Sequence, residues 1–154
     1  MIDTATNTVI ATIPVGNAPR GVAFSPGGTR AYGTNRSDDN VSVIDTATNT
    51  VIATIPAGAS PTGVAVTLGG TRAYVTNQTS GDVTVIDTAT NTVITTIPTG
   101  ASPTGVAVTL GGTRAYVANF NSGTVSVINT ATDTVEATLG AGVNPDYVAI
   151  ANVP

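Results

Sequence analysis

The chain has 154 residues, which is long enough for one domain with its own hydrophobic core. Only 9% of the residues are charged and the net charge is −4, with five Arg and neither Lys nor His. Because neutralising phosphates needs cations, neither nucleic acid nor an anionic membrane surface is an expected partner. The absence of Cys excludes disulfides and thiolate sites.

The sequence repeats itself every 42 residues. The same phase recurs at isoleucine, arginine and tyrosine positions: Ile2, Ile44, Ile86 and Ile128; Arg30, Arg72 and Arg114; Tyr32, Tyr74 and Tyr116. A fixed period of this size is typical of repeat architectures. We therefore expect a single domain over residues 1–154, made of repeats 2–43, 44–85, 86–127 and a partial repeat 128–154.

Each repeat is predicted to form four short strands, which in the second repeat and its continuation cover residues 50–55, 63–67, 72–77 and 82–87. These runs are rich in Val, Ile, Thr and Tyr, which suit a pleated surface. The breaks between them carry turn chemistry: Gly69-Gly70 favours a hairpin, and Asn49 is the expected left-handed residue after Asp45. Pro56 and Pro61 bracket a connection that cannot continue a sheet. No window has helical spacing.

Both faces of a run such as residues 63–66 are apolar or small, which indicates strands covered on both sides. Four-stranded antiparallel meanders that stack radially meet this requirement, and such an arrangement is a β-propeller. A solenoid is the rival interpretation, but its turns are usually shorter. We therefore predict an all-β fold of propeller blades.

The residues that carry a family resemblance are Tyr-Val-Thr-Asn at 74–77, with Tyr-Gly-Thr-Asn at 32–35 and Tyr-Val-Ala-Asn at 116–119. Together with the surrounding repeat they make the chain resemble the YVTN β-propeller repeat, of the surface-layer type. The resemblance implies exported or cell-surface proteins of archaea and bacteria, so an extracellular or cell-surface location is expected. The family often has Ser-Pro-Asp-Gly in the first hairpin, where this chain has Ser-Pro-Gly-Gly at 25–28.

With the family's strand order, three blades are expected to be complete, at about residues 21–56, 63–98 and 105–139. Residues 1–14 would supply the end of a C strand and a D strand of a preceding blade, and residues 147–151 a lone A strand of a following blade. Propellers close with about four to eight blades. We expect head-to-tail association, with a homodimer of six whole and two composite blades favoured over a filament.

The start of the sequence in mid-repeat, without a charged-then-apolar leader, leaves two further expectations open. The start in mid-repeat suggests an excised or shortened copy of something longer, such as a larger propeller. For the leader, either a signal peptide was removed with upstream sequence, or the protein never had one.

One end of the expected ring varies between repeats while the turns at the other end stay constant, and variable loops on a constant scaffold favour recognition. The candidate recognition face consists of Arg20, Arg36, Asp38, Asp39, Gln78, Asp82, Phe120 and Asn121. Such groups could contact a glycan or a protein loop, with Phe120 as an exposed aromatic. They could equally be solvated residues that have drifted. The recurring arginines and tyrosines are interpreted as structural.

The sequence of these loops and their flanks also suggests one possible ion site and one possible modification. Asp38 and Asp39 could contribute to a calcium site, although two carboxylates are few for an ion that takes six to eight oxygen ligands. Asn35, Asn40 and Asn77 stand in Asn-x-Ser/Thr form, the acceptor pattern for N-glycosylation.

Catalysis is not expected, because the chain lacks His, Cys and Lys and has Glu136 as its only Glu. No cofactor and no metal are expected. The leading hypothesis is a non-catalytic binding or scaffold module of a cell-surface or secreted protein. The alternative is a purely structural, self-assembling element of a lattice or filament, and a metal-dependent propeller hydrolase is a more distant one.

Overall fold

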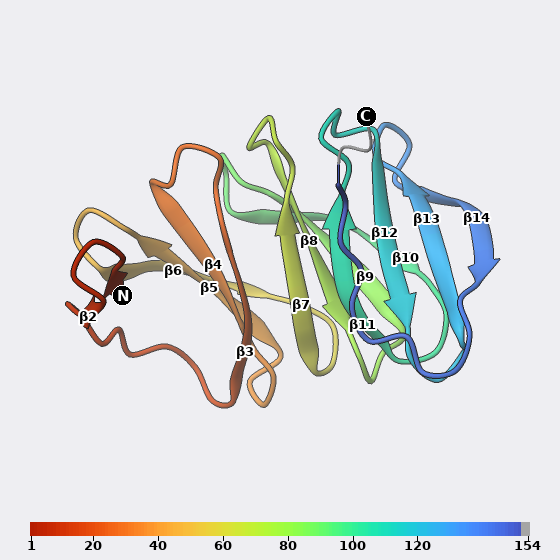
Figure 1. Cartoon of the computed structure of the whole chain (residues 1–154), viewed down its shortest axis with the longest axis horizontal. Coiled ribbons are helices and arrows are strands. Elements are labelled where there is room, and N and C mark those ends of the chain that lie inside the picture. Colours follow the sequence, from red (N-terminus) through yellow and green to blue (C-terminus); the bar gives the residue numbers. More distant parts are fainter. Residues whose placement is uncertain (152–154) are drawn as a thin grey trace.

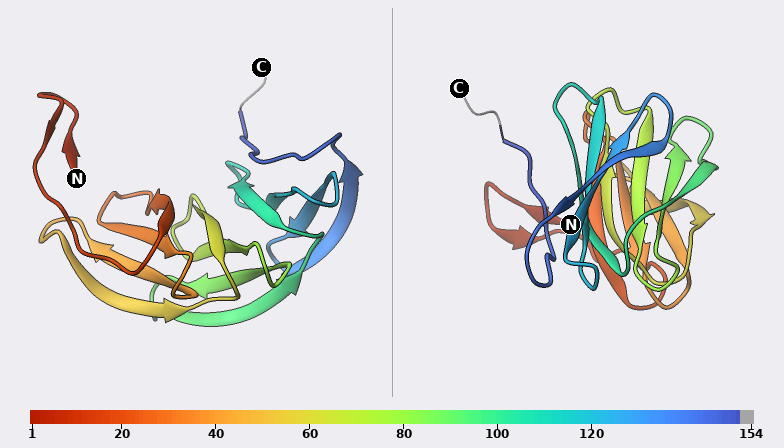
Figure 2. Two further views of the ribbon diagram at one scale, coloured as in Figure 1. Left: turned by 90° about the horizontal axis from the view of Figure 1, so that it is seen from below. Right: turned by 90° about the vertical axis from the view of Figure 1, so that its right-hand side faces the viewer.

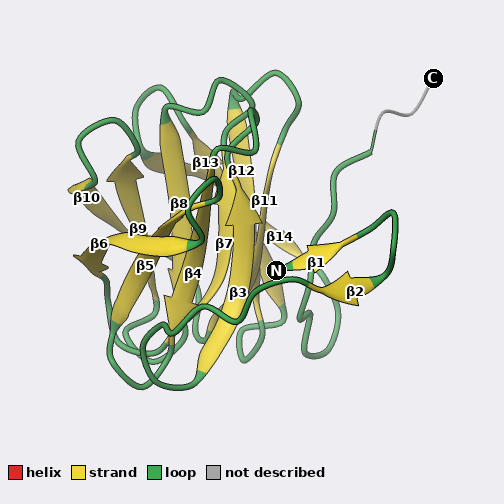
Figure 3. Ribbon diagram, turned by 90° about the vertical axis from the view of Figure 1, so that its left-hand side faces the viewer, coloured by secondary structure: helices red, strands yellow, loops and turns green. Residues whose placement is uncertain are grey.

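The computed structural model describes residues 1–151, and these contain strands, turns and loops but no helix (Figure 3). The first strands are β1 (Ile2–Asp3), β2 (Thr8–Val9), β3 (Pro19–Phe24), β4 (Arg30–Asn35), β5 (Asn40–Asp45) and β6 (Thr50–Pro56). They are followed by β7 (Pro61–Val66), β8 (Arg72–Asn77), β9 (Asp82–Asp87) and β10 (Thr92–Pro98). The last are β11 (Pro103–Val108), β12 (Arg114–Asn119), β13 (Thr124–Asn129) and β14 (Thr134–Gly140).

Twelve of these strands form three four-stranded sheets, each a simple antiparallel meander in which strand order follows the chain. The sheets are β3 to β6, β7 to β10 and β11 to β14, and we call them the first, second and third blade (Figure 1). The first strands of the blades, β3, β7 and β11, lie next to one another. The prediction of three complete blades is confirmed, and the solenoid interpretation is not.

The turn chemistry also follows the sequence. The Asp45 carboxylate accepts hydrogen bonds from the backbone N–H groups of Ala47 (2.9 Å) and Thr48 (2.9 Å), and Asn49 is left-handed with φ 55°. Asp87 repeats the arrangement in the second blade. These hydrogen bonds hold the carboxylate in its charged form, and they lower the pKa of Asp45 and Asp87.

The hydrophobic core lies between blades rather than within one sheet. Between the first and second blades, Tyr32 and Val43 pack on Val75 and Ile86. Between the second and third blades, Tyr74 and its neighbours pack in the same way on Val117 and Ile128. Each blade is therefore stabilised by packing against the next one. This agrees with the prediction, made from the apolar residues on both faces of the strands, that both faces are covered.

The three blades form an open arc, with the β1–β2 segment at one end and the segment after β14 at the other (Figure 2). Strands β1 and β2 pair with each other as a separate hairpin, with Ile2 opposite Val9. Solvent reaches side chains on the outer faces of the arc: Val22 on the first blade is 64% exposed and Leu139 on the third is 50% exposed. Within residues 1–151 no helix is long and apolar enough to cross a membrane.

The predicted lone strand at residues 147–151 is wrong as a strand, because within the described part of the chain no strand pairs with it in a ladder. The segment nevertheless takes the position of a next inner strand. A Cβ placed on Gly105 would lie 2.7 Å from the carbonyl oxygen of Asp146, just as one on Gly63 would lie 2.4 Å from that of Thr104. The D strand expected within residues 1–14 is likewise paired only at Thr8–Val9.

Candidate recognition face and axial pocket

The Thr of the Tyr-Val-Thr-Asn signature connects neighbouring blades near the axis. The Thr76 hydroxyl accepts a hydrogen bond from the N–H of Gly63 (2.8 Å) and donates to the carbonyl of Thr104 in the next blade (2.5 Å). Thr34 makes the same pair of contacts with Gly21 and Thr62, at 2.8 Å each. In the third blade Ala118 replaces this threonine, and the Thr104 hydroxyl donates to the Asp146 carbonyl instead (2.7 Å).

The Asn of the signature closes each blade from within. The Asn77 amide, fully buried, donates to Asp82 (2.6 Å) and to Thr84 (2.8 Å). Asn35 donates in the same way to Asn40 and Ser42. Because the amide nitrogens of Asn35 and Asn77 are buried and engaged, neither can accept a glycan in the folded chain. Asn40 is partly exposed at the start of β5.

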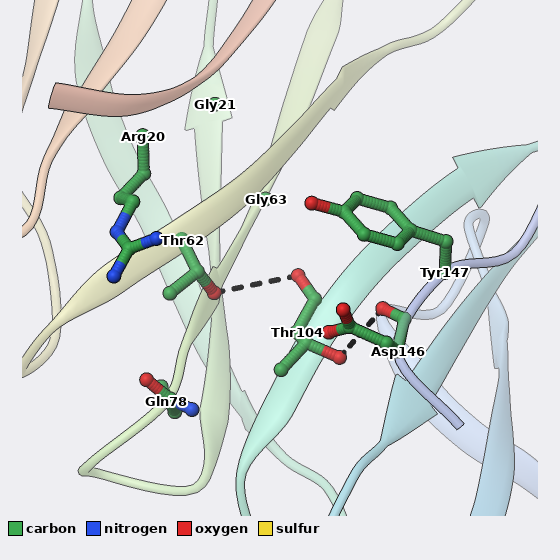
Figure 4. A pocket seen from close by; sticks show the side chains of 8 residues that line it. All are labelled: Arg20, Gly21, Thr62, Gly63, Gln78, Thr104, Asp146 and Tyr147. Atoms are coloured by element: carbon green, nitrogen blue, oxygen red, sulfur yellow. Dashed lines mark hydrogen bonds between the residues drawn. The ribbon is translucent and has the colours of Figure 1, made fainter. Parts of the chain in front are cut away.

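A pocket of about 250 Å³ lies along the inner strands (Figure 4). Four of its lining residues are related by the repeat: Arg20, Thr62, Thr104 and Asp146 stand 42 residues apart. Gln78 and Tyr147 also line it. The pocket therefore has a cation at one end of the series, an anion at the other and hydroxyl groups between them. We call this pocket, lined by Arg20, Thr62, Gln78, Thr104, Asp146 and Tyr147, the axial pocket.

Two residues of the predicted recognition face, Arg20 and Gln78, line the axial pocket. Arg36 starts beside this region, because its N–H donates to the carbonyl of Ala18 (3.1 Å). Its guanidinium donates to the Gln78 side-chain oxygen (3.2 Å), and its buried Nε has no hydrogen-bond partner among the described residues. The structure thus brings Arg20, Arg36 and Gln78 together.

The three carboxylates of the predicted face serve the loops instead. Asp38 accepts hydrogen bonds from the N–H (2.7 Å) and side-chain amide (2.9 Å) of Asn17, and these bonds lower its pKa. Asp39 accepts from the N–H of Ser60 in the following connection (2.8 Å). Asp82 accepts from Asn77 and from the Ser80 hydroxyl (3.1 Å). Asp38 and Asp39 are neighbours in sequence, but their carboxylates stabilise two different loops.

Phe120 is half-buried, which corrects the expectation of an exposed aromatic. Its N–H donates to the Ser102 carbonyl (2.9 Å), so the residue is drawn against the connection that precedes β11. Asn121 is exposed, and its amide donates to the Ser102 hydroxyl (2.7 Å). Sequence reasoning missed Thr62, Thr104, Asp146 and Tyr147 as pocket residues. The signal was available, because Arg20 and the first three of these share one position in the repeat.

The recurring arginines and tyrosines lie between blades, away from the pocket. Arg72 donates to the carbonyl of Thr130 (2.6 Å) and to the carboxylate of Asp133 (2.8 Å), both on the third blade. The Tyr74 hydroxyl donates to Asp133 (3.1 Å), and burial raises the pKa of Tyr74 to about 12. Arg30 donates in the same way to Thr88 (2.6 Å), but the buried hydroxyl of Tyr32 has no partner among the described residues.

Within residues 1–151 no three carboxylates come together in a way that could hold a metal ion, and the chain has no His or Cys to add to them.

Comparison with known protein families shows which family the repeat resembles. The model of the YNCE-like β-propeller family matches residues 23–114, which is more than half of the chain. A search of curated proteins finds no match.

Three solved structures share the architecture. A chain titled Kuenenia stuttgartiensis hydrazine synthase superposes with a TM-score of 0.82 at 26% identity, over 91% of this chain and 41% of that one. A functionally unknown protein from Desulfotomaculum acetoxidans gives 0.77 at 18% identity, over 86% and 45%. U3-55K gives 0.74 at 15% identity, over 82% and 40%.

The last two likenesses show the fold alone, and the chain spans less than half the length of each of these three proteins. The surface-layer subtype stays a prediction. At the level of the family the matched residues include the first two signature segments, at 32–35 and 74–77. The chain therefore belongs to the YNCE-like β-propeller family, of YVTN type.

Proposed function

We propose that this chain is a non-catalytic binding module that presents variable loops on one face of a propeller, at the cell surface or in the exterior. The observation that carries the proposal is the axial pocket. Its repeat-related positions hold Arg20, Thr62, Thr104 and Asp146, while the Thr-Ala-Thr turns recur unchanged. Side chains that differ from blade to blade, set on an unvarying frame, are the usual arrangement of a recognition surface.

The chemistry of the pocket favours a polar ligand rich in hydroxyl or carboxylate groups, such as a glycan or an exposed protein loop. The guanidinium of Arg20 lines the pocket, and Gln78 and the threonine hydroxyls offer both donors and acceptors. The loop carboxylates are engaged in holding backbone, so ligand contacts fall to Arg20, Gln78 and Tyr147.

A catalytic role has less support than a binding role. Glu136, the only Glu, pairs with Arg114, and this pairing lowers the pKa of Glu136. It is therefore poorly suited to act as a base at neutral pH.

Binding of the purified chain to an array of neutral and acidic glycans tests the proposal. We expect retention of a glycan class by the wild-type chain and loss of at least about tenfold in affinity for Arg20→Ala and Gln78→Ala. Thr90→Ala, in an exposed turn at the opposite end, is the matched control and should bind like wild type. Equal binding by all variants, or binding of no glycan or protein loop, contradicts the proposal.

A structural, self-assembling role is the second candidate, and the open faces of the arc favour it. Val22 and Phe24 of the first blade are 64% and 52% exposed. Their counterparts Val64 and Val66 pack against the preceding blade. Exposed apolar faces of this kind promote association. Ordered polymers or closed oligomers that form without any ligand would support this role.

A further inference from the structure

We propose that the open face of the third blade binds the β1–β2 hairpin of a second copy of this chain. The inference rests on the self-assembling role given above as the second candidate function, and on the head-to-tail association that the sequence predicts. It adds which residues meet and which contacts hold the two copies together.

The two interfaces inside the arc supply the template. At each interface, an arginine and a tyrosine lie at the start of the second strand of one blade, which is β4 or β8. They face a turn of the next blade, which is the β9–β10 turn or the β13–β14 turn. Arg30 donates to Thr88, and Arg72 donates to Thr130 and Asp133. The apolar residue that precedes this turn, Ile86 or Ile128, is fully buried in the interface.

The third blade carries the arginine half of the same interface without its counterpart. Tyr116 is half-buried, whereas Tyr32 and Tyr74 are fully buried. Arg114 is exposed and pairs with Glu136 of its own blade, and among residues 1–151 its guanidinium donates to no carbonyl of another blade. Leu139, at the position of the buried Ile97, is 50% exposed.

The β1–β2 hairpin carries the turn half, already folded. The Asp3 carboxylate accepts hydrogen bonds from the N–H groups of Ala5 (2.8 Å) and Thr6 (3.2 Å), as Asp45 and Asp87 do in their turns, and Asn7 is left-handed with φ 55°. Ile2 holds the position of Ile86 and Ile128 but is 62% exposed. In this pairing Ile2 of the second copy would cover Tyr116, and Arg114 would donate to the carbonyl of Thr4.

Charge complementarity at the axis points to the same pairing. Inner-strand positions meet in chain order, since the Thr62 hydroxyl donates to the backbone carbonyl of Thr104 (3.3 Å) and the Thr104 hydroxyl donates to that of Asp146 (2.7 Å). In a ring of two copies, the neighbour of Asp146 is Arg20 of the second copy. The last position of the series is therefore an anion and the first a cation, which suits head-to-tail closure.

Light scattering on variants of the 154-residue chain tests the pairing. Ile2→Glu should keep the blade fold by circular dichroism and raise the dissociation constant at least about tenfold, because it puts a charge in a buried apolar contact. Ile94→Glu is the matched control, since its position already carries Glu136 in the third repeat. It should associate like wild type.

Charge exchange at the axis tests the orientation. Asp146→Arg alone and Arg20→Asp alone should each associate more weakly, and an equimolar mixture of the two should recover wild-type association, because both interfaces of the mixed ring are then complementary. A wild-type chain that stays monomeric contradicts the association itself. A wild-type dimer that is insensitive to Ile2→Glu and to charge exchange contradicts this pairing alone. Glycan binding is measured separately, so its failure bears only on the binding role.

Discussion

Arg72 and Asp133 face each other across the boundary between the second and third blades, with 2.8 Å between Nη1 and Oδ2. The same carboxylate accepts the hydrogen bond of the buried Tyr74 hydroxyl. At the equivalent boundary between the first and second blades, Asn91 stands in place of Asp133, and the Tyr32 hydroxyl is buried without a partner among the described residues. The two boundaries thus differ in whether a carboxylate stands at this position of the turn.

We expect Asn91→Asp to stabilise the chain by about 1 kcal/mol, because the new carboxylate can accept from both Tyr32 and Arg30. Asp133→Asn is the reverse change and should destabilise by about 1–2 kcal/mol, since a charged acceptor is lost from a partly buried site. Urea unfolding followed by circular dichroism measures both. A destabilised Asn91→Asp variant would contradict the equivalence of the two boundaries.

The threonine of the signature should matter more for stability than its exposed counterparts in the turns. Thr76→Val removes the hydroxyl that bridges Gly63 and Thr104. It takes from the Gly63 N–H its acceptor in a partly buried site, and leaves the Thr104 carbonyl with only the longer hydrogen bond from Thr62. A loss of about 2 kcal/mol is expected. Thermal unfolding measures it, with Thr90→Val as the exposed control, for which a change within about 0.5 kcal/mol is expected. A loss at Thr76 no larger than that of the control would refute the bridging role.

Glycine is required where inner strands of neighbouring blades touch. A Cβ on residue 63 would lie 2.4 Å from the carbonyl oxygen of Thr104, so Gly63→Ala must push the second and third blades apart. We expect a loss of about 1–3 kcal/mol. Gly69→Ala is the control, because nothing lies within 4 Å of its added Cβ. Equal unfolding midpoints for the two variants would show that the blades do not approach as closely as described.

Acid sensitivity should arise from the turn carboxylates. Hydrogen bonds from backbone N–H groups, chiefly that of Thr48 for Asp45 and that of Thr90 for Asp87, lower the pKa of both carboxyl groups below the usual range of an aspartate. A folded-state pKa below the unfolded one adds stability above the unfolded value, and that stability is lost as pH falls through the folded pKa. Stability should therefore be steady from about pH 5 to 8, where no His titrates, and fall below about pH 4.

The double variant Asp45→Asn, Asp87→Asn isolates this effect. Asn129 already holds the equivalent turn of the third blade, accepting from the N–H of Ala131 (2.9 Å), so the fold should survive. The acid loss of stability should become shallower than in wild type when unfolding is measured from pH 7 to pH 2. An unchanged slope would assign the acid sensitivity to other carboxylates.

Much of the fold was accessible from the sequence because every repeat carries the same local instructions. The bounds of β8 and β9 follow from the alternation of apolar residues between Gly-Gly and Asn, and the left-handed Asn49 follows from the Asp-initiated turn. The lone segment 147–151 was predicted as a strand because its composition matches β7 and β11. Strand pairing depends on a neighbour, which local composition does not report.

The site was less accessible, because its contacts join different blades. Nothing local indicates that Asp38 binds Asn17 while the adjacent Asp39 binds Ser60. The burial of Phe120 depends on the connection before β11 in the same way. By contrast, the series from Arg20 to Asp146 could have been found by aligning the repeats, because equivalent positions on the inner strands must line one axis.

The mass of the purified 154-residue chain in solution tests the central claim, that an arc of blades with open faces pairs head to tail. Light scattering over a range of concentrations should give about twice the chain mass of 15.2 kDa, persisting on dilution. A stable monomer of 15.2 kDa at every concentration would contradict it.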